Sequence, residues 1–139
     1  MNLKKIVLPG IAGGVIFFFL GYLFYAVLFK NMMVRPVAGV DRPMDQMVWW
    51  SLMLGCVFYG VLLAFILAKS NDASLITSII TAATVGFLAT SYFDFTMHAT
   101  TYLLGKKALI CDVAISTVMS AITGAAVVFI AGLGNKKSA

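Results

Sequence analysis

Residues 108–133 read ALICDVAISTVMSAITGAAVVFIAGL, and this long run holds only one charged side chain, that of Asp112. About 20 consecutive apolar residues are enough for a helix to cross roughly 30 Å of hydrocarbon. Three more apolar runs of sufficient length lie at about residues 3–29, 47–68 and 75–104. We therefore predict an all-α fold, a four-helix transmembrane bundle, in which residues 1–139 form a single integral membrane domain.

The composition supports this class. The chain is 62% hydrophobic and 11% charged, whereas about a quarter of the residues of a soluble domain are charged. A transmembrane β-barrel would show short segments of alternating hydrophobicity instead. The lysines and arginines sit at the ends of the apolar runs, as helix-end anchors do, and they form no basic patch. The expected partner is therefore the lipid bilayer, and nucleic acid is excluded.

Four spans place both termini on one side of the membrane, but the distribution of positive charges does not indicate whether that side is cytoplasmic. The terminal side carries Lys4, Lys5, Lys69, Lys136 and Lys137. The opposite side carries Lys30, Arg35, Arg42, Lys106 and Lys107. This tie leaves the orientation weakly specified, or fixed by a partner. We expect cytoplasmic termini in a bacterial inner membrane.

Ionisable side chains inside the third and fourth spans mark the candidate site. Asp94 and His98 lie one helical turn apart in SYFDFTMHAT, and Asp112 lies in the next span. At about 1.5 Å per residue, all three fall in the half of the bilayer nearest the turn between these spans. Charged groups at this depth are costly unless they face a bundle interior, a cavity or a partner. We predict that Asp94, His98 and Asp112 form one cluster.

Hydroxyl groups extend this cluster along both helices. One stripe at helical spacing runs along the third span: Thr77, Thr81, Thr84, Leu88, Ser91, Asp94, His98 and Thr101. A second runs along the fourth span: Asp112, Ser116, Ser120 and Thr123. Because a short turn makes the two helices antiparallel neighbours, we expect the stripes to face each other. The predicted supporting polar residues are Tyr92, Thr96, Ser91, Ser116 and Tyr25.

Small residues in the first two spans predict close packing within the bundle. Gly10 and Gly14 form a G-x-x-x-G pattern, which lets helices approach closely. In the second span Ser51, Gly55 and Tyr59 line up on one face, with Gly60 beside them. Pro36, Gly39 and Pro43 are expected to break regular structure in the only long connection.

The second half of the chain resembles a family of small bacterial membrane proteins known only as a domain of unknown function. The family signature is Tyr-Asp-Leu-Thr-Asn, followed after a short basic turn by an apolar stretch containing Asp; YFDFTMHATT and KKALICDVAIST match it over about residues 85–125. The resemblance maps the family residues onto Tyr92 (with Phe93 inserted), Asp94, Thr96 and Asp112. Met97 or His98 stands in place of the Asn, and the Trp that often follows the second Asp is absent.

The first span, LGYLFYAVLFKN, is similar to a second uncharacterised four-helix family. That family carries Gly-x-x-Trp-Tyr and then Leu-Phe, where this chain has Phe24-Tyr25 in place of Trp-Tyr. Both resemblances imply a four-helix fold, and neither implies an activity.

Several interpretations of the Asp94–Asp112–His98 cluster stay open from the sequence. The carboxyl groups could simply fix the register of two helices, or they could share one proton, because burial and a neighbouring carboxylate both favour the protonated form. His98 beside them could relay protons. The same three side chains could ligate a divalent cation. Copper(I) binding by Met32, Met33, Met44 and Met47 is less favoured than apolar contacts at the interface.

Two classes of function follow. The first is a small transport or ligand-binding protein whose site takes a proton, a cation or a polar small molecule. The second is an accessory or assembly subunit of a larger membrane complex. The protein partners considered are further copies of this chain or other subunits of such a complex. Paired aspartates could act as general acid and base, but no common catalytic motif is present, so no catalytic residue is assigned and an enzyme is less favoured. The sequence identifies no cofactor and no particular metal.

Overall fold

The computed structural model describes residues 4–31, 40, 42–70 and 74–136. Within these residues the secondary structure is helical, with no strand, so the predicted all-α class is confirmed. The elements are α1 (Lys4–Gly21), the π-helix η1 (Tyr22–Leu28), the short 3-10 helix η2 (Met44–Gln46), α2 (Trp49–Lys69), α3 (Leu75–Thr100) and α4 (Lys106–Lys136).

Four helical segments of the described chain are long and apolar enough to cross a membrane. Their bounds are Ile6–Leu28, Trp49–Lys69, Leu75–Thr100 and Lys106–Gly132. The four-span prediction is therefore confirmed, and the chain has the architecture of an integral membrane protein. The third span ends before the expected residue 104, because Thr101 has an extended backbone and residues 101–105 form the turn.

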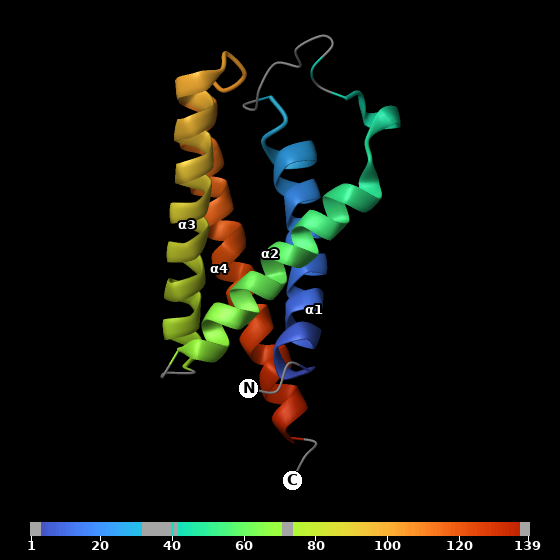
Figure 1. Ribbon diagram of the computed structural model, residues 1–139, viewed down its shortest axis with the longest axis vertical. Coiled ribbons are helices and arrows are strands. Elements are labelled where there is room, and N and C mark those ends of the chain that lie inside the picture. Colours follow the sequence, from blue (N-terminus) through green and yellow to red (C-terminus); the bar gives the residue numbers. More distant parts are fainter. Residues whose placement is uncertain (1–3, 32–39, 41, 71–73, 137–139) are drawn as a thin grey trace.

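The bundle consists of two helical hairpins. In Figure 1, α3 and α4 lie side by side, and α2 crosses α1 obliquely, so the beginning of α2 diverges from the other helices. Helix α4 contacts α1, α2 and α3 and is the most buried of the four spans. The start of α1 and the end of α4 lie at one end of the bundle, and the α3–α4 turn lies at the other (Figure 1).

Glycines allow the closest helix contacts. Gly60 of α2 lies against the backbone of Gly10 and Gly14 of α1, where an added Cβ atom would overlap backbone atoms. The prediction that the G-x-x-x-G pattern packs within the bundle is confirmed. Gly55 does not take part, because nothing lies within 4 Å of the position where its Cβ would be. Such close approach strengthens van der Waals packing, which drives helix association in lipid.

The end of the first span departs from the expected α-helix. Residues Tyr22–Leu28 form a π-helix, and the N–H of Phe29 donates to the carbonyl oxygen of Phe24 at 2.8 Å, five residues back. The π-helix is rare and is often found at functional sites. The expected breaks at Pro36 and Gly39, and the side chains of Met32, Met33, Arg35 and Lys137, lie outside the described residues.

Candidate functional site

The structure brings Asp94 and Asp112 together. Asp94 lies in α3, and its side chain is only 2% exposed. The carboxyl groups of Asp94 and Asp112 are within hydrogen-bonding reach of each other and also interact electrostatically. Both residues lie in the half of the bundle nearest the α3–α4 turn. The pairing follows from the short turn, which makes α3 and α4 antiparallel neighbours and sets both residues at a similar depth.

Tyr25 and Ser116 complete this carboxyl pair. The hydroxyl group of Tyr25, in η1, lies 3.1 Å from the Oγ atom of Ser116, in α4. The same hydroxyl group is within hydrogen-bonding reach of Asp112. Tyr25 therefore connects the first hairpin to the carboxyl pair in the second. Both residues belong to the predicted supporting set.

Two oxygen atoms near the pair are buried without a partner. The Oδ2 atom of Asp94 and the Oγ atom of Ser91, one helical turn away, make no hydrogen bond to the part of the chain that the structure describes. Buried polar atoms are normally hydrogen-bonded, and an exception calls for a physical explanation such as water or an ion. These two oxygen atoms can therefore accept a hydrogen bond or coordinate a cation.

His98 makes a contact that the sequence did not predict. Its Nδ1–H donates to the carbonyl oxygen of Leu104 at 2.7 Å, which ties the end of α3 to the turn that follows. No basic side chain of the described residues is among the groups that act electrostatically on Asp94. No three acidic, histidine or cysteine side chains in the described part of the chain gather closely enough to hold a metal ion. Of the three predicted site residues, the structure therefore brings Asp94 and Asp112 together, and a role of His98 beside them stays a prediction.

Tyr92 and Thr96 lie outside the cluster. Tyr92 is 78% exposed and points away from the bundle interior. The hydroxyl group of Thr96 donates to the carbonyl oxygen of Tyr92 at 2.7 Å, so it is satisfied within its own helix. The sequence placed these residues near Asp94 by proximity along the chain, but the rotation of α3 turns them outwards.

The polar stripes face each other only near Asp94. Along the rest of α3, the residues buried against α4 are Ser78, Ala82 and Gly86, not the predicted threonines. Thr84 is exposed and donates to the carbonyl oxygen of Ile80. The expected stripe is therefore wrong over this half of the helix, because small side chains permit the closer contact.

Three residues of the stripe on α4 are buried, namely Ser116, Ser120 and Thr123, whereas Asp112 is half-buried. The hydrogen-bond partner of the middle residue, Ser120, comes from α2. The hydroxyl group of Tyr59 lies 2.7 Å from the Oγ atom of Ser120, which is fully buried. The Oγ1 atom of Thr123 has no hydrogen-bond partner among the described residues. The sequence grouped Tyr59 with the small packing residues of α2 and gave no signal for this contact, which depends on the oblique crossing of α2.

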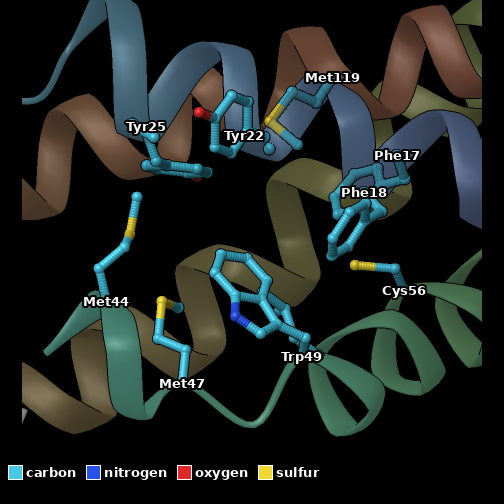
Figure 2. A pocket seen from close by; sticks show the side chains of 12 residues that line it. Phe17, Phe18, Tyr22, Tyr25, Met44, Met47, Trp49, Cys56 and Met119 are labelled. Atoms are coloured by element: carbon cyan, nitrogen blue, oxygen red, sulfur yellow. The ribbon is translucent and has the colours of Figure 1, made fainter. Parts of the chain in front are cut away.

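An apolar cavity of about 310 Å³ lies beside the carboxyl pair, between the end of the first span and the start of α2. Figure 2 shows Trp49 and Met47 on one side, with Tyr22, Tyr25 and Met119 across from them. The lining residues are Phe17, Phe18, Gly21, Tyr22, Tyr25, Ala26, Met44, Met47, Trp49, Leu52, Cys56 and Met119. Tyr25 belongs both to this lining and to the carboxyl cluster.

Comparisons with known proteins give no indication of the function. No protein-family model matches the chain, and neither a curated protein nor a solved structure is detectably similar to it. The resemblance of residues 85–125 to an uncharacterised family stays a prediction. The geometry of the site itself therefore carries the functional argument.

Proposed function

We propose that this integral membrane protein binds a proton or a small cation at the Asp94–Asp112 pair, as the binding step of a transport or ligand-binding function in a bacterial inner membrane. The observation that carries the proposal is the contact between two carboxyl groups, one of them 2% exposed, inside an apolar bundle. Two adjoining carboxylates cannot both be ionised without a large cost in free energy. A proton or a cation between them removes that cost.

The chemistry of the pair favours a shared proton as its resting state. Ionised carboxylates only accept hydrogen bonds, so a hydrogen bond from one carboxyl group to the other requires a proton on one of them. A small cation could replace the proton, with oxygen ligands from the pair, Tyr25, Ser91 and Ser116. Oxygen atoms are the ligands that hard cations prefer. Exchange of a proton for a cation at one site is the elementary step of coupled transport.

Infrared spectroscopy of the protein in lipid tests the proton directly. We expect a carbonyl stretching band of a protonated carboxyl group near neutral pH, weakened in Asp94→Asn and in Asp112→Asn. Asp45→Asn is the matched control, because Asp45 is exposed in η2. Added Na⁺ or K⁺ should decrease the band if a cation replaces the proton. A spectrum with no such band, unchanged by either cation, would contradict the proposal.

Proteoliposomes test transport. With a potassium gradient, valinomycin and an internal pH-sensitive dye, we expect proton uptake by the wild-type protein and by Asp45→Asn. The two asparagine variants of the pair should lose it. If both variants transport protons at the wild-type rate, the pair is not part of a transport path.

An accessory subunit is the second candidate, and one feature of α2 favours it. Arg42 and the exposed Ser51 line an open groove between the first half of α2 and Phe17 of α1. Polar groups facing outwards at membrane depth are best satisfied by protein. Purification in mild detergent discriminates between the two candidates, because a stable assembly containing this chain alone counts against an accessory role.

A further inference from the structure

The cavity of about 310 Å³ is lined by side chains that favour one chemical class of ligand, and its volume limits the size of that ligand. Five aromatic rings surround it: those of Phe17, Phe18, Tyr22, Tyr25 and Trp49. Three methionines add polarisable sulfur: Met44, Met47 and Met119. Pockets for small organic molecules are typically about 300–1,000 Å³ and mainly apolar and aromatic. The cavity is therefore large enough for a small organic ligand or for part of a larger one.

The rings are held in place by their own contacts. Trp49 meets the ring of Phe18 edge to face, with centroids 6.4 Å apart. Phe17 packs against Tyr59 at 4.7 Å. Trp49 is 40% exposed and Tyr22 is 50% exposed, so the cavity opens at these residues, whereas Met119, 1% exposed, closes its inner end.

The described lining of the cavity is uncharged, whereas the cation Arg42 lies in the lining of a neighbouring groove that shares Phe17, Leu52 and Cys56 with the cavity. No lysine or arginine is among the described residues that line it. Its wall includes the ring of Tyr25, whose hydroxyl group contacts Ser116 and reaches Asp112. A negative charge on the carboxyl pair therefore lies directly behind an aromatic wall. Aromatic faces attract cations, and quaternary ammonium ions are bound by aromatic cages.

We propose that this cavity binds a lipophilic organic cation, with its apolar groups among the aromatic rings and its charge directed towards Tyr25 and the Asp94–Asp112 pair. The proposal rests on the proposed function, because it takes the pair to be the negative charge that attracts the ligand. An anionic amphiphile would find no basic side chain in the described lining. A neutral lipid chain would fill the cavity without regard to the carboxyl pair.

Radioactive tetraphenylphosphonium, with the protein in nanodiscs of phosphatidylcholine, is a direct probe. Tetraphenylborate has the same shape and the opposite charge, and empty nanodiscs correct for partition into lipid. We expect saturable binding of tetraphenylphosphonium and none of tetraphenylborate. Trp49→Leu should weaken binding by about 2- to 30-fold, the range expected for loss of one cation–π contact. Phe58→Leu is the control, because Phe58 lies on α2 outside the cavity and is 66% exposed.

The variant Asp112→Asn tests the charge. It should weaken tetraphenylphosphonium binding by about tenfold, the loss of roughly one charge interaction across a ring. Saturable binding of tetraphenylborate with equal affinity, or cation binding that Trp49→Leu or Asp112→Asn leaves unchanged, would overturn the proposal. The infrared band of the carboxyl pair needs no organic ligand, so the proposed function and this inference can fail independently.

Discussion

The hydroxyl group of Tyr59 on α2 lies 2.7 Å from the Oγ atom of Ser120 on α4, in the buried centre of the bundle. The contact joins the two hairpins at mid-bundle, and the Tyr25–Ser116 contact joins them again one helical turn along α4. In both places a tyrosine of the first hairpin satisfies a serine of the second. The polar face of α4 is therefore matched by hydroxyl groups of a different hairpin.

The Tyr59–Ser120 contact should contribute measurably to stability. Tyr59→Phe leaves the hydroxyl group of Ser120 buried without this partner, and Ser120→Ala does the reverse. Interhelical hydrogen bonds in membranes contribute about 0.6 kcal/mol on average and at most about 1.7 kcal/mol in double-mutant cycles. We expect a coupling free energy in that range, measured by unfolding in mixed micelles. Strictly additive effects of the two substitutions would show that the contact contributes nothing.

Gly86 should be intolerant of a side chain. An added Cβ atom would overlap the side chain of Ser120 and approach the carbonyl oxygen of Ser116 to 3.1 Å. Gly86→Ala should therefore destabilise the α3–α4 pair by about 1–3 kcal/mol.

Gly55→Ala is the matched control for Gly86→Ala. Nothing lies within 4 Å of the added atom, and alanine favours a helix by about 1 kcal/mol over glycine. The unfolding midpoint should decrease for Gly86→Ala and should stay the same or increase for Gly55→Ala. Equal midpoints for both would mean that α3 and α4 do not approach as closely as the structure shows.

His98 should stabilise the turn and leave the carboxyl pair unaffected. His98→Leu removes the hydrogen bond to Leu104, and we expect a loss of about 0.5–1.5 kcal/mol in stability. The infrared band assigned to Asp94 and Asp112 should stay unchanged. A band that shifts or vanishes in His98→Leu would restore the predicted relay role of this histidine.

Cysteine labelling should show the two ends of the bundle on opposite sides of the membrane. Lys69→Cys and Lys107→Cys form a matched pair, because each removes one exposed lysine from one end of a span. In a background with Cys56 and Cys111 replaced by alanine, a membrane-impermeant maleimide should label only Lys107→Cys from outside the cell, which corresponds to cytoplasmic termini. Labelling of both positions from one side would exclude the four-span arrangement.

Much of the fold could be predicted from the sequence because its signals are local. A long apolar run ended by lysines identifies a span whatever its neighbours are, and all four predicted spans are present. The contact between Asp94 and Asp112 was predictable for a related reason. The rise per residue fixes the depth of each side chain, and a short turn fixes the partner helix.

The rest of the site could not be predicted, because it depends on helix rotation and on neighbours distant in the sequence. Thr96 and Tyr92 are closer to Asp94 along the chain than Ser91 is, yet the rotation of α3 turns them outwards. The hydrogen bond of His98 to Leu104 depends on where α3 ends, which hydrophobicity placed four residues too late. The π-helix that carries Tyr25 lies in a run whose apolar pattern is that of an ordinary span.

The sequence by itself therefore determined an all-helical membrane protein of four spans, with two aspartates at similar depth in neighbouring helices. Only the tertiary structure decided that Tyr25 and Tyr59 reach α4 and that an aromatic cavity lies beside the carboxyl pair. The physical reason is that span length and depth follow from hydrophobicity and helical rise, which are properties of each segment. Which faces meet depends on how closely backbones approach at Gly60 and Gly86, and that is settled only when all four helices pack together.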